Sequence, residues 1–181
     1  MGGGPSQNVL YYLAYGSNLH PVRLRERVGS ARFIDVVQLS HYQLLFQKRG
    51  MDVSGKCTLV HTGREADVVY GAVYQIDPAH KPELDAFEGL GNGYFESRLT
   101  VTLSRQEYPC FTYVAQPSYI VNNLKPYHWY KHLVVLGAKH CNFPEAYVRS
   151  IEVIESVEDS DEARREQHQR LIEEIINYEN E

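Results

Sequence analysis

The sequence predicts one α+β domain whose sheet is mainly antiparallel or closed. Three observations support this prediction. The chain has 181 residues, 43% of them hydrophobic, which suffices for one domain with a buried core. Segments rich in β-branched and aromatic residues fill most of the chain before the helical segments near its carboxyl end. No internal repeat indicates a solenoid or a propeller.

Strand-forming segments dominate the first part of the chain, and Gly, Asp and Ser residues separate them, as expected for turns. The predicted strands cover residues 9–15, 31–37, 42–46, 57–62 and 68–76. A short helix over residues 21–28 is predicted between the first two strands, because Pro21 suits the first helical position and Gly29 suits the end.

The segment "DPAHKPELDAFEG" (77–89) predicts a turn followed by a short helix. Asp77 is a suitable cap and Pro78 a suitable first residue, whereas Pro82 would interrupt one long helix. We therefore expect a short turn and then about one and a half helical turns that end at Gly89.

Two strands and two helices are predicted next. The strands lie at residues 95–103 and 109–115. The helices are expected over residues 126–136, with Gly137 as the end, and from Pro144 to Ile154, with Asn142 as the cap.

The main domain is predicted at residues 9–155, after a flexible amino-terminal segment at residues 1–8. Residues 156–181 are predicted to form an acidic linker and a helical appendage. This helix carries an apolar strip, formed by Leu171, Ile172, Ile175 and Ile176. Docking of the strip on its own domain is favoured over the alternative, a homodimer contact.

Charge and cysteine content narrow the function classes. The formal net charge is −5 and no basic stripe is present, so a nucleic-acid partner is not expected. The local cluster of Arg23, Arg25 and Arg27 is interpreted as a solvated helix face. The three cysteines are too few and too scattered for a disulfide framework, so a reducing, cytoplasmic compartment is expected.

No membrane association is expected, because no run approaches the ~18 apolar residues of a membrane span. The first residues, "MGGGPSQ", lack the charged and apolar regions of a secretory signal. Gly2 and Ser6 satisfy a loose myristoylation pattern, but a flexible terminus is favoured.

The stretch "YYLAYGSNL" (11–19) is the first candidate site. A strand that ends in Gly16, Ser17 and Asn18 before a helix leaves backbone N–H groups without partners, which suits an anion. Gly16 would let a ligand approach the backbone, so Gly16→Val should abolish ligand binding and leave the fold largely intact. The structural alternative is an ordinary turn in which Ser17 or Asn18 caps the helix.

The segment "LDAFEGLGNGYFE" (84–96) supplies a candidate acid or base. Glu88 is expected at the carboxyl end of a helix, where the helix dipole disfavours a negative charge, and a carboxyl group in such a place suits general acid–base catalysis. The alternative is a surface carboxylate before a glycine-rich turn. Glu83, Asp85 and Glu96 are rival carboxylates.

No metal or nucleotide cofactor is expected. His128 and His132 have a spacing suitable for zinc, and His140 and Cys141 follow, but no clear fourth ligand accompanies them. The sequence has no P-loop or dinucleotide-binding glycine motif, and no cysteine lies in a nucleophile motif with a paired histidine.

Taken in order, these segments resemble the γ-glutamylcyclotransferase family over about residues 9 to 155. The motifs that carry the resemblance are "YYLAYGSNL" (11–19), "VVYGAVYQI" (68–76), "LDAFEG...GY" (84–94), "CFTYV" (110–114) and "YHWYKHLVVLGAKHCNFPEAYVRSI" (127–151). The resemblance implies a small closed or nearly closed mixed β-barrel with helices packed outside. It also implies a cofactor-independent cyclisation that converts a small γ-glutamyl amide into 5-oxoproline and a free amine or amino acid.

The resemblance also implies roles for particular residues. The catalytic glutamate falls on Glu88 and a substrate-contacting tyrosine on Tyr130. The remaining substrate-binding residues fall on Tyr12, Leu13, Ala14, Tyr15, Gly16, Ser17 and Asn18. Tyr94 and Tyr113 fall near other pocket tyrosines. The leaving group of the amide stays undetermined, and a catalytically silent binding or interaction module of the same fold is the alternative function.

Overall fold

The structure is a computed structural model that describes residues 9–180. The predictions for residues 1–8, including Gly2 and Ser6, lie outside the described residues. Within the described part, no helix combines the length and the apolar character needed to cross a bilayer.

A five-stranded mixed sheet forms the framework. Its strands, in the order in which they pair, are β2 (Arg32–Ser40), β5 (Val68–Ile76), β1 (Leu10–Ala14), β7 (Gln106–Ala115) and β6 (Tyr94–Leu103). The pairing of β1 with β7 is parallel and the other pairings are antiparallel. Among the described residues, no pairing joins the edge strands β2 and β6, so the closed barrel is not confirmed.

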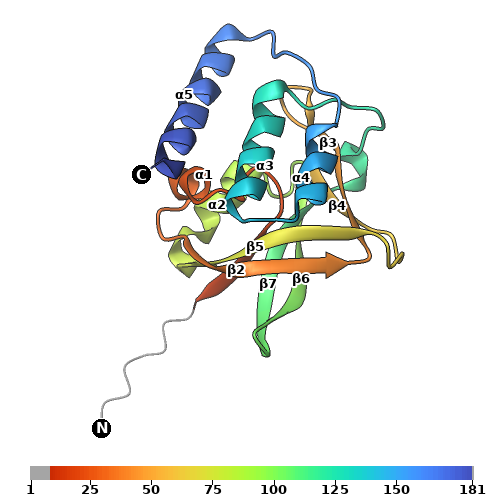
Figure 1. Ribbon diagram of the computed structural model, residues 1–181, viewed down its shortest axis with the longest axis vertical. Helices are drawn as coiled ribbons and strands as arrows, with labels where there is room; N and C mark the ends of the chain where they lie inside the picture. The colour runs from red at the N-terminus through yellow and green to blue at the C-terminus, as the bar shows by residue number, and fades with distance from the viewer. Residues whose placement is uncertain (1–8, 181) are drawn as a thin grey trace.

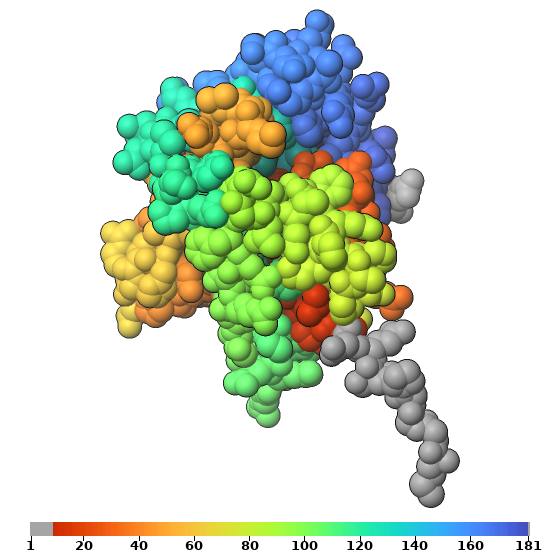
Figure 2. All heavy atoms as spheres, turned by 180° about the vertical axis from the view of Figure 1, so that it is seen from behind, coloured from red at the N-terminus to blue at the C-terminus, as the bar shows by residue number. Residues whose placement is uncertain are grey.

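Strands β3 (Tyr42–Arg49) and β4 (Gly55–His61) form a separate antiparallel hairpin. Both strands extend beyond the predicted segments, and their register places Lys48 opposite Lys56. Figure 2 shows the connecting loop near residue 50 (orange) at the surface, beside the segment that precedes residue 127 (teal). A hydrogen bond from Tyr127 Oη to the Asp52 carbonyl oxygen, 3.0 Å, links the two segments.

Helices gather on one side of the sheet in Figure 1. Their bounds are α1 (Pro21–Arg27), η1 (Pro78–His80), α2 (Lys81–Glu88), η2 (Pro117–Tyr119), α3 (His128–His140), α4 (Glu145–Glu152) and α5 (Glu162–Glu179). The predicted turn and short helix are confirmed as η1 and α2. Asp77 caps η1 through its carboxylate, and Gly89 ends α2 in the left-handed region with φ 65°.

Two predicted helix boundaries are wrong. Helix α3 continues through Gly137 because this glycine serves packing: a Cβ there would lie 2.5 Å from Leu19 Cβ. Glycine thus lets α3 approach the loop that follows β1. Asn142 does not cap α4; it has φ 52°, and Pro144 holds the cap position without a side-chain hydrogen bond.

Helix α5 packs on its own chain. Leu171, Ile172 and Ile175 are buried in a cluster with Leu133 of α3. At the other end of the helix, Glu179 Oε1 accepts hydrogen bonds from both His20 and His140. The apolar strip is therefore largely covered within the chain, in agreement with the favoured prediction.

Candidate active site

The loop after β1 turns sharply and ends at α1. The Leu19 N–H donates to the Gly16 carbonyl oxygen, 3.1 Å, and His20 caps α1 by accepting a hydrogen bond from the Val22 N–H through Nδ1, 3.2 Å. The alternative in which Ser17 or Asn18 caps the helix is therefore wrong. Because His20 performs this function, the Asn18 side chain can make other contacts.

Asn18 connects the loop to Glu88. Its Nδ2 donates to Glu88 Oε1 at 2.8 Å and to the Tyr12 hydroxyl at 3.1 Å. Arg27 Nη1 donates to the same Glu88 oxygen at 3.1 Å. The Glu88 side chain, at the end of α2, is 14% exposed. Two donors on one oxygen, one of them a cation, suit an ionised carboxylate.

A small cavity lies at this junction, with a volume of about 30 Å³. Its lining comes from β1, the loop after it, α2, β4, β6, β7 and α3. The lining residues are Tyr12, Tyr15, Gly16, Ser17, Asn18, Cys57, Glu88, Tyr94, Tyr113 and Tyr130. One polar atom in this group is unpaired: Asn18 Oδ1 is buried and, among the described residues, has no hydrogen-bond partner. A buried acceptor without a donor is costly, so this atom suits a ligand that brings one.

Two of the lining tyrosines form hydrogen bonds with the backbone of Cys57. The Tyr94 hydroxyl donates to the Cys57 carbonyl oxygen, 2.6 Å, and the Cys57 N–H donates to the Tyr130 hydroxyl oxygen, 3.1 Å. Burial raises the pKa of Tyr94 and Tyr130 well above the usual value, so both remain neutral hydroxyls. Burial also raises the pKa of the Cys57 thiol to about 12, so this thiol is not a thiolate nucleophile at neutral pH.

Gly16 is required by its contact with Cys57. A Cβ at position 16 would lie 2.9 Å from Cys57 Cβ and 3.1 Å from Cys57 Sγ. Both residues are buried, so neither atom has free space to move into. Glycine here serves close packing of the loop on β4.

A second, larger cavity adjoins the first. Its volume is about 490 Å³, and Ser17, Glu88, Tyr94 and Tyr130 line both cavities. Its charged lining residues are Arg23, Arg27, Lys48, Asp52, Lys56, Glu88 and Arg164. We call this space the outer cavity. Its cations outnumber its carboxylates, which favours an anionic occupant.

Comparison with known proteins identifies relatives of this chain. Residues 68–151 match the model of the AIG2-like family. A human protein named gamma-glutamylcyclotransferase is 29% identical over 160 residues, which are 84% of this chain and 82% of the human protein. The protein of the same name from Bos taurus is 30% identical over 149 residues, 80% of this chain and 78% of the bovine protein. The chain belongs to the γ-glutamylcyclotransferase family.

Solved structures share the γ-glutamylcyclotransferase architecture of this chain. A structure named gamma-glutamyl cyclotransferase has a TM-score of 0.77 at 24% identity and covers 90% of this chain and 99% of its own. An uncharacterized protein from Homo sapiens has a TM-score of 0.75 at 25% identity and covers 91% and 98%. These alignments extend over most of the chain, beyond the segment matched by the AIG2-like model.

Of the residues to which the family resemblance assigns substrate contacts, two do not line the small cavity and the others do. Leu13 and Ala14 are fully buried in β1 and are not among the residues that line the small cavity. The other assigned residues, including Glu88 and Tyr130, do line it.

The rival carboxylates lie elsewhere in this γ-glutamylcyclotransferase-family structure. Asp85 and Glu96 both pair with Lys81, at 2.7 and 2.8 Å. Glu83 is exposed. Glu88 is therefore the carboxylate that the fold brings to the loop.

The interpretation of the arginine cluster as a solvated face is wrong for two of its members. The side chains of Arg23 and Arg27 are 11% and 17% exposed and line the outer cavity. Their spacing of four residues places them on one face of α1, whereas Arg25 Nε donates to the Ala31 carbonyl oxygen. That spacing was the signal that could have identified them.

Helix α5 supplies further residues that sequence reasoning missed. Arg164 and His168 line the outer cavity. His168 stacks on Trp129 with 3.6 Å between ring centroids and an interplanar angle of 11°. Arg164 donates to both oxygens of Asp159, at 2.6 and 2.5 Å, which orients the start of the helix.

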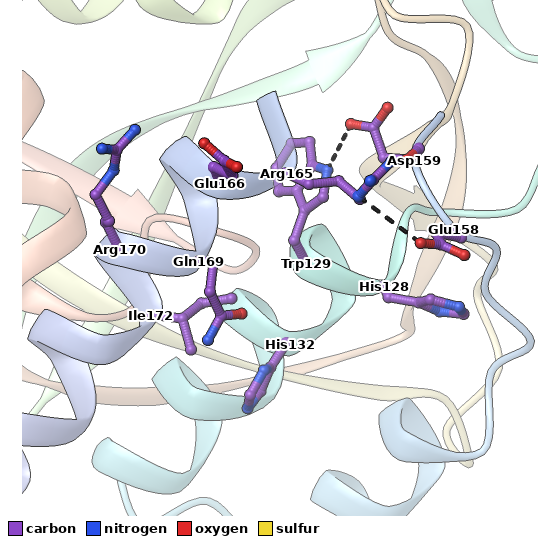
Figure 3. Close-up of a pocket in the computed structure, with 10 residues that line it drawn as sticks. All are labelled: His128, Trp129, His132, Glu158, Asp159, Arg165, Glu166, Gln169, Arg170 and Ile172. Atoms are coloured by element: carbon purple, nitrogen blue, oxygen red, sulfur yellow. Dashed lines mark hydrogen bonds and ion pairs between the residues drawn. The ribbon is translucent and has the colours of Figure 1, made fainter. Parts of the chain in front are cut away.

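Another cavity, of about 630 Å³, lies between α3 and α5 (Figure 3). Two pairs of its polar groups contact one another: Trp129 Nε1 donates to Asp159 at 2.9 Å, and Arg165 forms an ion pair with Glu158 at 3.7 Å. None of the candidate residues of the family site lines this cavity. We therefore place the candidate active site in the first two cavities.

One cluster has the composition of a metal site. His20, His140 and Glu179 bring their ligand atoms within 4.8 Å of one another. However, His20 Nδ1 accepts the Val22 N–H, so the neutral ring carries its proton on Nε2 and donates it to Glu179. This tautomer has no lone pair on Nε2 for a metal. The cluster is better explained as the hydrogen-bonded attachment of α5.

His168 makes stability depend on pH. Burial, together with Arg23, Lys56 and Arg27, lowers the pKa of His168 from 6.5 to about 4. As pH falls from 6.5 toward 4, the histidine of the unfolded chain binds a proton before that of the folded chain. The contribution of neutral His168 to the free energy of unfolding is therefore complete above the unfolded pKa and is lost as pH falls toward the folded pKa. Between about pH 7.5 and about pH 5, we expect the Tm of the unaltered protein to fall by roughly 2 °C more than that of His168→Phe, which keeps the stack. Equal Tm losses in thermal denaturation would contradict this prediction.

Proposed function

We propose that this chain is a γ-glutamylcyclotransferase that converts a γ-glutamyl amide into 5-oxoproline and a free amine. The observation that carries the proposal is the pairing of Glu88 with Asn18 at the small cavity, where the unpaired Asn18 Oδ1 lies beside a carboxylate. An α-ammonium group has three N–H donors and satisfies both acceptors.

The reaction begins with a proton transfer. Glu88 takes a proton from the α-ammonium group, and the resulting amine attacks the γ-carbonyl carbon of the same molecule. The new C–N bond closes the five-membered ring. The bond to the leaving amine breaks as Glu88 donates this proton to its nitrogen, and the ring nitrogen then gives its extra proton to the freed Glu88 carboxylate, which passes it to solvent, so that a neutral lactam and a free amine remain. Because the substrate supplies the nucleophile, holding it in a curled conformation is the main task of the protein, and such positioning is worth several kcal/mol.

The loop and the tyrosines hold the rest of the γ-glutamyl unit. Within residues 9–180, the N–H groups of Ser17 and Asn18 donate to no protein acceptor, and they stabilise the α-carboxylate or the oxyanion of the forming ring. The Tyr130 hydroxyl oxygen already accepts the Cys57 N–H, so its own hydrogen donates to the substrate. The small cavity holds about one water molecule, so the substrate extends into the outer cavity.

The experiment that tests this function is the measurement of 5-oxoproline release from a panel of γ-glutamyl amino acids, γ-glutamyl amines and glutathione. We expect release from at least one class, with the free amine in equal amount. Absence of 5-oxoproline throughout the panel would favour the alternative, a catalytically silent binding module of the same fold. A cytoplasmic location and a homodimer stay predictions.

A further inference from the structure

Lys48 is a buried cation that forms no ion pair within the described residues 9–180. It is only 7% exposed, and its Nζ lies over the ring of Tyr94, 4.5 Å from the centroid. The carboxylates of the outer cavity pair with other cations: Glu88 with Arg27 at 3.1 Å, and Asp52 with Lys56 at 2.7 Å. Within residues 9–180, no ion pair or hydrogen bond involves Lys48 Nζ. An unpaired buried ammonium costs stability, so its presence calls for an explanation.

The strand pairing makes the position of Lys48 still less favourable. Lys48 lies directly opposite Lys56 in the β3–β4 hairpin, and both line the outer cavity. Like charges directly opposite one another destabilise a strand pair. Asp52 forms its ion pair with Lys56, so the carboxylate of the connecting loop is engaged by the other lysine.

Arg23 is a second cation of the outer cavity whose hydrogen-bonding groups are not all paired. The side chain of Arg23, on the α1 side of the outer cavity, is 11% exposed. Its Nε is buried and, among the described residues, has no hydrogen-bond partner. Its ion pair with Glu26 has a long separation of 3.6 Å. Two elements far apart in the sequence thus offer unsatisfied positive groups to the same space.

The small cavity determines which end of the substrate meets these cations. Tyr94 lines both cavities, and its ring carries Lys48 Nζ on the side of the outer cavity. With the γ-glutamyl unit at Asn18 and Glu88, the part that extends outward is the leaving amine. A carboxylate on that amine would supply Lys48 with the ion-pair partner that residues 9–180 do not provide.

Resting on the proposed function, we propose that Lys48 determines specificity by binding a carboxylate of the leaving group, with Arg23 adding to the positive field. Among γ-glutamyl conjugates, Lys48 therefore favours those whose leaving amine carries a carboxylate. It discriminates against conjugates of the same size whose leaving group is neutral.

The test compares γ-glutamyl-alanine with γ-glutamyl-alaninamide, which differ only in carboxylate against carboxamide. The unaltered protein should show a kcat/KM about tenfold or more higher for γ-glutamyl-alanine. Lys48→Met should lower this value about tenfold and leave the value for the alaninamide within about twofold. Lys48→Arg should keep most of the preference, because it keeps the charge.

Two controls separate a binding role from a structural one. Lys125→Met makes the same substitution at an exposed lysine outside both cavities and should change neither kcat/KM. The Tm of Lys48→Met without ligand should be equal to or higher than that of the unaltered protein, since an uncompensated charge is removed. A lower Tm with equal losses for both substrates would identify Lys48 as structural and overturn the proposal.

Failure of the cyclotransferase function and failure of the Lys48 subsite give different results. If no compound of the panel, these two included, yields 5-oxoproline, the cyclotransferase assignment fails, and the subsite is then tested by calorimetric binding of the same two compounds to the unaltered protein and to Lys48→Met. Preferential binding of γ-glutamyl-alanine that is lost in Lys48→Met would support the subsite. Equal binding of the two compounds, or no binding of either, would overturn it.

Discussion

Glu88→Gln should lower kcat for 5-oxoproline release by roughly 10²–10⁴-fold, the usual contribution of a general acid–base group. Glutamine preserves the shape of the side chain and accepts the hydrogen bond of Asn18 Nδ2, but it cannot take up the proton of the α-ammonium group. The measurement is a steady-state assay of 5-oxoproline, with circular dichroism to show that the fold is retained.

The matched control is Glu83→Gln on the same helix, where the side chain is exposed. This variant should keep kcat within about twofold, because surface substitutions have small effects. Comparable losses in both variants, or full activity in Glu88→Gln, would refute the assignment of Glu88 as the acid and base.

Gly16→Val should abolish 5-oxoproline release and destabilise the protein by about 1–3 kcal/mol or more, the usual cost of overpacking a core. Turn chemistry alone predicted a ligand-binding defect in an intact fold. The contact of 2.9 Å between a Cβ at this position and Cys57 Cβ adds the cost in stability. Thermal denaturation and the 5-oxoproline assay check the two effects.

Gly29→Val is the control for Gly16→Val. Gly29 is exposed after α1, and a Cβ there would meet nothing within 4 Å. Its Tm and activity should remain close to those of the unaltered protein. If Gly16→Val retained its Tm, the close packing of the loop on β4 would lose its support.

Helix caps, prolines and turn residues in the sequence predicted the short elements whose ends depend on neighbouring residues. Asp77 and Pro82 specify the turn and short helix that bring Glu88 to its place, and the structure confirms both. Gly137 shows the limit of such signals, since its small size serves a contact with Leu19 rather than a helix end. Sequence spacing does not distinguish these two uses of glycine.

The outer cavity could not be predicted for a related reason. Lys48 and Lys56 lay outside the predicted strand segments, and only the observed register places them opposite each other. Arg27 meets Glu88 across a separation of 61 residues, which no local pattern encodes. The loop and the glutamate could be assigned from motifs, whereas the cations around them depend on tertiary contacts.

The position of α5 in the chain determines when the site can be completed during synthesis. Glu88, its loop and Tyr130 all emerge from the ribosome before Arg164 and His168, which form part of the outer wall. The attachment of the helix to His20 and His140 requires Glu179, which emerges later still. A nascent chain that has folded its sheet therefore holds the groups proposed for the chemistry, yet it completes the lining of the outer cavity only after α5 has docked.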